Sequence, residues 1–241
     1  MRKTVVIDYL PERAKAYGNE YALVAVDVIR ATTTAVTCVA LGRKCYPVPS
    51  VEAAHVFAAQ FADPLLVGEV GGIMPEGFHL NNSPADLMMR TDAHRPMILV
   101  SSSGTRLICS AAEGQSMYVT CLRNYRAQAA YLAAHHPMVA LIGAGTKGEF
   151  REEDQLGCAW IAECLLATGY EPADEKTASI IKRWSDVPVE SIVDGPSVDY
   201  LRRTEQMKDL DFILTHIDDL DDVFRLEQGQ LVKYSTEPLP R

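Results

Sequence analysis

The chain has 241 residues, of which 48% are hydrophobic and 23% charged, a balance that excludes a disordered protein and supplies a sizeable core. A formal net charge of −9 makes nucleic acid a poor partner, because binding a phosphate backbone needs a basic surface. No apolar run approaches the roughly 18 residues of a membrane span, no signal-peptide pattern is visible, and the six cysteines form no C-x-x-C pair, so we expect a cytoplasmic protein with free thiols.

Short runs rich in Val, Ile and Leu alternate with segments of helical periodicity up to about residue 170. The expected strands are Thr4–Ile7, Tyr21–Val26, Lys44–Val48, Leu65–Val67, Met97–Val100, Met117–Thr120 and Val139–Ile142. The expected helices are Thr33–Leu41, Val51–Phe61, Pro84–Arg90, Thr105–Glu113, Tyr125–His135 and Glu152–Thr168. Strands that are apolar on both faces and separated by helices predict an α/β fold with a mostly parallel sheet covered by helices.

The residues after 170 follow a different pattern, which favours a smaller α+β part. Two helices and a terminal hairpin around Gln228-Gly229 are expected, over Ala173–Trp184, Ser197–Lys208, Val223–Leu226 and Leu231–Tyr234. We therefore expect a main α/β domain over residues 1–170, which carries the site, and a C-terminal helical and hairpin subdomain over 171–241. The boundary is soft, because no linker marks it.

Polar residues follow five of the expected strands. Open parallel sheets bind ligands beyond the carboxyl ends of their strands. The segments are Asp27 with Arg30–Thr34, Gly68-Glu69 with the loop to Asn82-Ser83, Ser101–Thr105, Arg123-Asn124, and Gly143–Gly148 with Glu152–Asp154. Five such ends at one edge of the sheet predict a binding site there.

Two of these segments lead into helix starts, where free N–H groups and the helix dipole favour an anion. Their members are Thr32, Thr33 and Thr34 in one, and Ser102, Ser103, Gly104 and Thr105 in the other. Either segment alone is more typical of an ordinary helix cap. Arg30 beside one and Arg106 beside the other favour an anion site.

The carboxylates at these loop ends predict a metal site. They are Asp27, Glu69, Glu153 and Asp154, and no His or Cys is spaced with them as in a transition-metal site. Hard oxygen ligands select Mg²⁺, with Mn²⁺ as a second option. Asp27 directly follows a buried run, where a carboxylate is costly unless it is paired or metal-bound. Acidic residues at a helix start, such as Glu152, also have the simpler role of stabilising the helix through a favourable interaction with its dipole.

Several familiar hydrolase signatures are absent from the sequence. There is no D-x-D-x-T, C-x5-R or R-H-G phosphatase motif and no serine-hydrolase G-x-S-x-G. Among the histidines, His79 in the Gly-rich loop is the one we keep as a candidate site residue.

These motifs together resemble those of the 2-phosphosulfolactate phosphatase family. The resemblance rests on Val26–Thr34, Gly68-Glu69, Gly77-Phe78, Asn82-Ser83-Pro84, Ser103-Gly104-Thr105, Gly143-Ala144-Gly145, Phe150 and Glu153-Asp154, in the order of the family. It covers about residues 20 to 165, with a weaker match over Ser197–Asp211. It implies a distinctive α/β fold, Mg²⁺ dependence and hydrolysis of a phosphate ester next to a carboxylate and a sulfonate.

The sequence departs from the family pattern at four positions. Val70 stands where the family usually has Arg, His79 where it favours Asp, Asn81 where it favours Gly, and Ser103 where it has Asn. Losing the arginine removes a bidentate anion contact. We therefore expect this protein to share the family's scaffold and metal chemistry more closely than its sulfonate-bearing substrate.

Three functional hypotheses follow. The first is a Mg²⁺-dependent phosphatase in which Asp27, Arg30, Glu69 and Asp154 are catalytic, and the substrate is a small anionic phosphorylated hydroxy acid. Its anionic groups would be held by Arg30, Lys147 and loop groups of Thr32–Thr34, His79, Asn82, Ser83, Ser102–Thr105, Asn124 and Gly145. The second is a repurposed family member that binds a small anionic metabolite, and a homo-oligomer is compatible with either.

The third hypothesis is a dinucleotide-binding protein, because Gly143-x-Gly145-x-x-Gly148 follows a strand. The motif runs into a group of acidic residues, which would repel a pyrophosphate. The sequence therefore favours the other two hypotheses.

Overall fold

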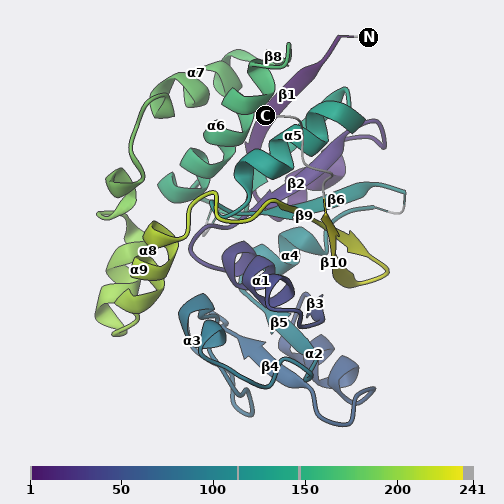
Figure 1. Ribbon diagram of the computed structural model, residues 1–241, viewed down its shortest axis with the longest axis vertical. Coiled ribbons are helices and arrows are strands. Elements are labelled where there is room, and N and C mark those ends of the chain that lie inside the picture. Colours follow the sequence, from purple (N-terminus) through teal and green to yellow (C-terminus); the bar gives the residue numbers. More distant parts are fainter. Residues whose placement is uncertain (1, 113, 146–147, 236–241) are drawn as a thin grey trace.

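The computed structural model describes residues 2–112, 114–145 and 148–235. Within them, ten strands form one sheet in the order β4-β5-β3-β10-β9-β6-β2-β7-β1-β8 (Figure 1). The strands are β1 Thr4–Tyr9, β2 Ala22–Val26, β3 Cys45–Pro47, β4 Leu65–Gly68, β5 Met97–Val100, β6 Ser116–Thr120, β7 Met138–Gly143, β8 Glu171–Pro172, β9 Asp222–Glu227 and β10 Gln230–Ser235. The helices are α1 Ala31–Ala40, α2 Val51–Ala58, α3 Pro84–Met88, α4 Gly104–Ile108, α5 Tyr125–His135, α6 Glu152–Leu166, α7 Glu175–Trp184, α8 Pro196–Arg203 and α9 Met207–Thr215, with 3₁₀ turns at Pro11–Ala16 and Val189–Ile192.

The sheet consists of two parallel groups joined by an antiparallel hairpin. Strands β6, β2, β7, β1 and β8 run parallel in one group, and β4, β5 and β3 run parallel in the other. The hairpin β9–β10 lies between the groups, where Leu231 pairs with Cys45 and Arg225 with Tyr118. The predicted α/β class, the mostly parallel sheet and the C-terminal hairpin are all confirmed.

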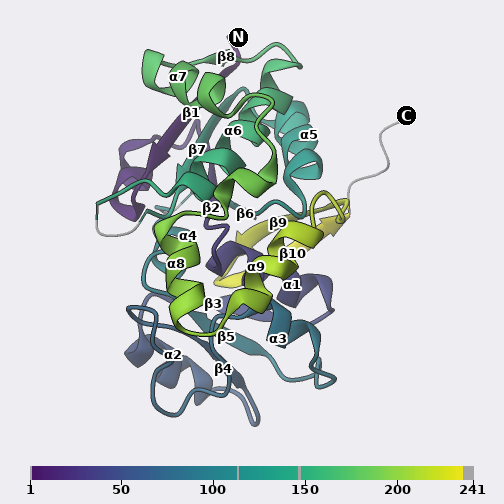
Figure 2. The same cartoon turned by 90° about the vertical axis from the view of Figure 1, so that its left-hand side faces the viewer.

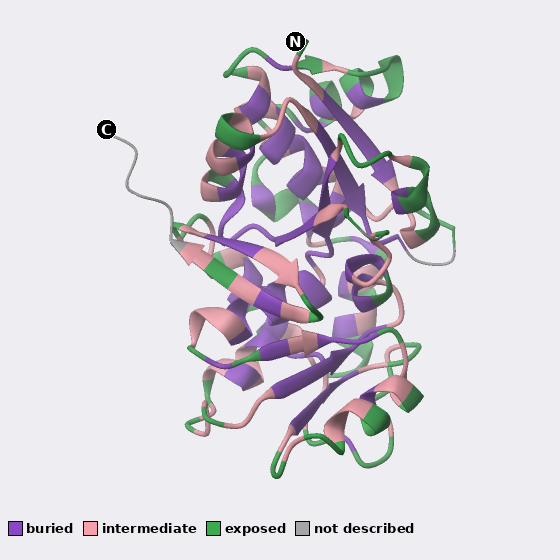
Figure 3. Ribbon diagram, turned by 90° about the vertical axis from the view of Figure 1, so that its right-hand side faces the viewer, coloured by how far each residue is buried: buried purple, intermediate pink, exposed green. Residues whose placement is uncertain are grey.

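Two apolar clusters cover the two faces of the β1–β2–β6–β7 group. Along β2, Val24 and Val26 belong to one cluster with residues of α5 and α6, whereas Leu23 and Ala25 belong to another with residues of α1 and α4. Alternate residues of a strand point to opposite faces, so a continuous apolar run buries both. Figure 3 shows these strands as buried along most of their length. This sandwich fixes the strand ends that carry the polar loops.

Most of the expected helices differ from the observed ones by a few residues at their ends, and two differ more. Ser197–Lys208 is not one helix: it is divided into α8 and α9 at Glu205, whose φ is 57°, and the Gln206 N–H bonds back to the Leu201 carbonyl. The helix expected over Thr105–Glu113 ends at Ile108. Ser110 donates its hydroxyl to the Leu107 carbonyl, a local hydrogen bond that competes with further helix.

The helices α8 and α9 pack on the loop that follows β2. Val198 and Leu201 of α8 and Leu210 of α9 form a small apolar cluster with Ile29. In Figure 2 the two helices lie in front of the middle of the sheet. Residues after 170 thus contribute α8 and α9 beside the β2 loop, the edge strand β8, and β9 and β10 in the middle of the sheet. No helix in the described ranges has the length and apolarity needed to cross a bilayer.

Candidate active site

A cavity of about 580 Å³ lies at the carboxyl ends of the parallel strands, within the size range of small-molecule sites. Its wall is built from the segments that follow β2, β4, β5 and β7, and from α8. The charged residues lining it are the carboxylates Asp27, Glu69, Glu153 and Asp154 and the arginines Arg30, Arg106, Arg151 and Arg203. The cavity therefore gathers charges of both signs in a protein whose net charge is −9.

Asp27 is held at the junction of β2 and α1. Its Oδ1 accepts the N–H of Ala31 at 3.1 Å, and its own N–H donates to the Thr32 hydroxyl at 2.9 Å. The peptide bond between Ile29 and Arg30, in the same turn, is cis. These contacts leave Asp27 buried in the cavity wall with its Oδ2 facing α4, where a Cβ on Gly104 would lie 2.3 Å from it. Only glycine at position 104 allows this approach.

Asp27, Glu153 and Asp154 form a buried carboxylate cluster, which is defined by these three residues. Burial raises the pKa of Asp27 to about 7, and the charges of Glu69 and Glu153 act in the same direction. Burial and then the charge of Asp27 raise the pKa of Asp154 well above its ordinary value, although Asp154 accepts the N–H of Val28 at 2.9 Å. Burial also raises the pKa of Glu153. The cluster resists ionisation unless a cation compensates its charge.

The cluster offers hard oxygen donors for a metal ion. In the described part of the chain, no group of three or more His, Cys, Asp or Glu side chains lies close enough to form a complete ligand set. Mg²⁺, however, is commonly bound by only one or two carboxylates, with water and ligand oxygens filling the other positions. Asp27 and Asp154, whose charges influence each other, suit that arrangement.

Glu69 holds two loops of the cavity together. Its carboxylate accepts the N–H of Ser102 at 2.8 Å, the hydroxyl of Ser102 at 2.9 Å and the N–H of Gly72 at 2.6 Å. The Ser102 hydroxyl in turn accepts the N–H of Gly71 at 2.7 Å. Glu69 therefore orders the loops after β4 and β5, and its role as a metal ligand stays a prediction.

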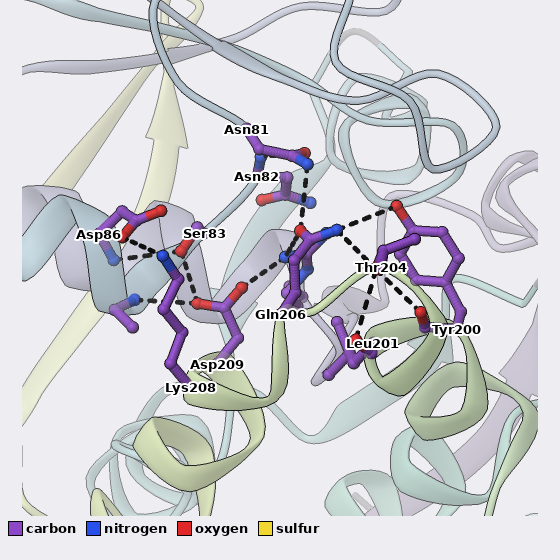
Figure 4. Close-up of polar contacts among 12 residues, drawn as sticks. Asn81, Asn82, Ser83, Asp86, Tyr200, Leu201, Thr204, Gln206, Lys208 and Asp209 are labelled. Atoms are coloured by element: carbon purple, nitrogen blue, oxygen red, sulfur yellow. Dashed lines mark hydrogen bonds and ion pairs between the residues drawn. The ribbon is translucent and has the colours of Figure 1, made fainter.

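Arg30 enters the cavity from the loop before α1 and is anchored by α9. Its Nη1 donates to Asp209 at 2.5 Å and to Gln206 at 2.6 Å. Asp209 is fully buried and also accepts the hydroxyl of Ser83 at 2.6 Å. Figure 4 shows Gln206 and Asp209 reaching from the α8–α9 segment toward the loop that carries Asn81 and Ser83. The C-terminal segment thus orients an arginine of the cavity.

Asn82 lines the cavity next to this network. It is 2% exposed, and its Oδ1 has no hydrogen-bond partner among the described residues. Buried amide oxygens are almost always paired. This unpaired group is available to a ligand, which supports the prediction that Asn82 binds substrate.

The predicted site residues fall into two groups. Those that line the cavity are Asp27, Arg30, Glu69, Asn82, Ser102, Ser103, Gly145, Glu153 and Asp154. Those that do not are Thr32, Thr33, Thr34, His79, Ser83, Gly104, Thr105 and Asn124. Residue Lys147 lies outside the described residues.

Most of the hydroxyls outside the lining have structural partners, whereas the buried hydroxyl of Thr34 has none among the described residues. Thr32 and Thr33 donate to the carbonyls of Asp27 and Val28, and Thr105 donates to the carbonyl of Ser101. These bonds fix the starts of α1 and α4. These hydroxyls therefore hold the turns before the two helices, although neither helix has a side-chain hydrogen bond at its N-cap residue.

Asn124 and His79 also make structural contacts. Asn124 accepts the hydroxyl of Thr120 at 2.9 Å at the end of β6, and it donates to the Asp222 carbonyl of β9. The Nδ1 of His79 accepts the N–H of Leu66 at 2.9 Å. Both side chains stabilise the ends of strands.

The sequence did not reveal the contribution of α8 and of Arg151. Pro196, Ser197, Tyr200 and Arg203 line the cavity from one face of α8. Pro196, Tyr200 and Arg203 have i, i+4, i+7 spacing opposite the buried Val198 and Leu201, and this spacing is the signal that marks the face. The Tyr200 hydroxyl donates to the carbonyl of Gly72, so α8 closes the cavity against the loop after β4.

The family model of 2-phosphosulpholactate phosphatase matches residues 8–229. This chain belongs to that family. A probable 2-phosphosulfolactate phosphatase of Caldanaerobacter subterraneus subsp. tengcongensis is 31% identical over 221 residues, which are 88% of this chain and 90% of the relative. One of Deinococcus radiodurans is 32% identical over 86% of both chains. One of Carboxydothermus hydrogenoformans is 35% identical over 158 residues, 65% of each chain.

Within the 2-phosphosulpholactate phosphatase fold, three of the four departures from the family pattern lie close to the cavity. Val70 is 50% exposed, between the lining residues Glu69 and Gly71, and its backbone pairs with Ile73. The Nδ2 of Asn81 donates to Gln206 at 3.0 Å, and Ser103 lines the cavity at the start of α4. His79, the fourth, is outside the lining.

Proposed function

We propose that this protein is a Mg²⁺-dependent phosphatase that hydrolyses a small phosphorylated hydroxy acid, either 2-phosphosulfolactate or a related phospho-carboxylate. The observation that carries the proposal is the buried carboxylate cluster of Asp27, Glu153 and Asp154 in the wall of the cavity. Three carboxylates with raised pKa values are costly to maintain without a cation. Its relatives, which are named probable 2-phosphosulfolactate phosphatases, support a phosphate ester as substrate.

Asp27 and Asp154 are the residues that would hold Mg²⁺ or Mn²⁺, with Glu153 beside them and Glu69 as the further predicted ligand. When bound, the cation supplies positive charge that neutralises phosphoryl oxygens and so favours attack at phosphorus.

The other tasks belong to groups of the chain itself. Arg30, oriented by Asp209, and the unpaired amide of Asn82 bind anionic oxygens of the substrate. A carboxylate of the cluster accepts the proton that the attacking water loses. The contact of Tyr200 with the Gly72 carbonyl keeps α8 against the loop after β4 and restricts entry of bulk water.

A phosphate-release assay with and without Mg²⁺, on a panel of phosphorylated hydroxy acids, tests the proposal. Asp154→Asn is expected to lower kcat by about 100-fold or more, the order for loss of a group acting on the reacting atoms. Glu152→Gln is the matched control, because Glu152 is the neighbouring carboxylate and instead pairs with Arg183 at the surface. Activity that is independent of Mg²⁺ and of Asp154 would contradict the proposal.

The second candidate is a family member that binds a small anionic metabolite without hydrolysing it. The observation that favours it is Val70, an apolar and half-exposed residue in the cavity loop where the family usually has Arg. Retained binding of the panel with no phosphate release from any member would favour this candidate.

A further inference from the structure

Two arginines of this protein differ from all its other described arginines. The chain has fifteen arginines, and all except Arg241 lie in the described part. Of those fourteen, twelve form an ion pair with a carboxylate. Arg106 and Arg203 make neither an ion pair nor a hydrogen bond with any described residue. Both of them line the cavity.

Exposure to solvent does not explain this difference. Arg106 and Arg203 are exposed, but so are several arginines that are paired. The side chain of Arg2 is 75% exposed and pairs with Glu171, that of Arg126 is 66% exposed and pairs with Asp218, and that of Arg202 is 53% exposed and pairs with Asp199. An acidic chain offers partners to surface arginines, and the two that lack one lie at the same cavity.

The two residues reach the cavity from distant parts of the chain. Arg106 is on α4, which follows β5, and Arg203 is at the end of α8. The other two arginines of the lining are already engaged, Arg30 by Asp209 and Arg151 by Glu149. Arg106 and Arg203 are therefore the lining arginines whose whole guanidinium groups are open to a ligand.

We propose that Arg106 and Arg203 form a second anion subsite, which binds the acidic group of the substrate that is not transferred. This inference rests on the proposed function, and it adds the residues that select a substrate with two acidic ends. A guanidinium binds a carboxylate or a sulfonate through paired N–H···O bonds, so both acids fit the chemistry.

The two arginines should favour phosphate esters that carry a second acidic group over esters that lack one. A phosphate ester with an uncharged remainder gains nothing from the two guanidinium groups, whereas an acidic remainder gains charge-assisted hydrogen bonds. We therefore expect wild-type protein to prefer 2-phospholactate or 2-(phosphonooxy)ethanesulfonate over isopropyl phosphate in kcat/KM.

The first arm of the test measures this preference in Arg106→Gln, Arg203→Gln and Arg202→Gln. The ratio of kcat/KM between each acidic ester and isopropyl phosphate is expected to fall about tenfold or more in the first two variants. Arg202→Gln is the matched control, since it removes an exposed arginine next to Arg203 that lies outside the cavity. An unchanged ratio in both Arg106→Gln and Arg203→Gln would overturn the subsite.

The second arm measures binding without catalysis, by calorimetry in Mg²⁺ with three phosphonates that cannot be hydrolysed. Both cavity variants should lose affinity about tenfold for 3-phosphonopropionate, 2-sulfoethylphosphonate or both, relative to propylphosphonate. The phosphonate that loses more identifies the acid. Equal affinities for all three in wild-type protein, or no binding of any, would overturn the subsite.

The two arms separate failure of the subsite from failure of the proposed function. Normal phosphate release with no preference for acidic esters would remove the subsite and leave the phosphatase. A preference for acidic phosphonates that depends on Arg106 and Arg203, with no phosphate release from any ester, would retain the subsite and reject the phosphatase.

Discussion

The guanidinium of Arg30 and the carboxylate of Asp209 form a buried ion pair of 2.5 Å between residues 179 positions apart in the chain. Their side chains are 3% and 0% exposed. Asp209 also accepts the hydroxyl of Ser83 and the N–H of Ala85, so one carboxylate of α9 fixes both the arginine of the cavity and the start of α3. A helix near the C-terminus thereby determines the geometry of residues near the N-terminus.

Replacing Asp209 by Asn should destabilise the protein and weaken substrate binding. The change leaves the buried charge of Arg30 without its counter-charge, and breaking such a pair costs about 3–5 kcal/mol. Urea unfolding should show this loss, and phosphate release should show a raised KM because Arg30 is no longer oriented. Asp211→Asn is the control, since Asp211 is exposed on the same helix. Equal stability of the two variants would contradict a structural role for the pair.

Replacing Gly104 by Ala should damage the cavity more than the fold. The added Cβ would lie 2.3 Å from the Asp27 Oδ2 and 2.5 Å from the Ala31 Cβ, so Asp27 or α4 must move. Overpacking of this kind costs about 1–3 kcal/mol. A shift of about 1 Å in a reacting group lowers kcat/KM on the order of 100-fold. Assays of phosphate release and of thermal unfolding measure the two effects.

Gly18→Ala is the control for that substitution. The added Cβ at Gly18 would meet only the carboxylate end of Glu20, which is flexible and can move away. Normal activity of Gly104→Ala would show that α4 does not pack on Asp27 as described.

The stability of metal-free protein should depend on pH through Asp27. Burial raises its folded-state pKa to about 7, from an ordinary value of 3.8. Between these values the unfolded chain loses its proton while the folded one keeps it, so the stability present below about pH 4 is lost as pH rises toward about 7. Asp27→Asn removes this titration. In EDTA, the melting temperature of Asp27→Asn minus that of wild type should therefore increase as the pH is raised from 4 to 8.

Addition of Mg²⁺ should reduce the difference between wild type and Asp27→Asn at pH 8, because a bound cation stabilises the ionised carboxylate. If the difference in melting temperature between the two proteins is the same at every pH, with and without the metal, Asp27 is not held in the environment described.

Glu69 and Ser102 should act as a coupled pair. The Ser102 hydroxyl donates to Glu69 and accepts the N–H of Gly71, so Glu69→Gln and Ser102→Ala disturb the same loop contact. A double-mutant cycle on kcat/KM should give a coupling of about 0.5–3 kcal/mol. Glu69→Gln combined with Thr215→Ala, a change at an exposed position of α9, should be additive. Additive behaviour of the first pair would contradict the shared contact.

Part of the site could be read from the sequence because it depends on local order. Asp27, Glu69 and Asp154 each follow a buried strand, and the carboxyl ends of parallel strands face the same way, so their meeting at one cavity was predictable. Whether a hydroxyl near them faces the ligand or the backbone was not. Thr32 donates to the nearby carbonyl of Asp27, whereas Asn124 accepts the nearby N–H of Cys121 and also donates to the distant carbonyl of Asp222.

Local patterns in the sequence predicted the α/β class, the parallel strands, the terminal hairpin and the cluster of carboxylates, because the spacing of apolar residues and the positions of strand ends are local properties of the chain. Three features came only from the packing of distant segments: α8 lines the cavity, Asp209 of α9 orients Arg30, and Arg106 and Arg203 have no partner among the described residues. These facts depend on contacts between segments far apart in sequence. Such contacts are fixed by packing of the whole chain, which no local pattern encodes.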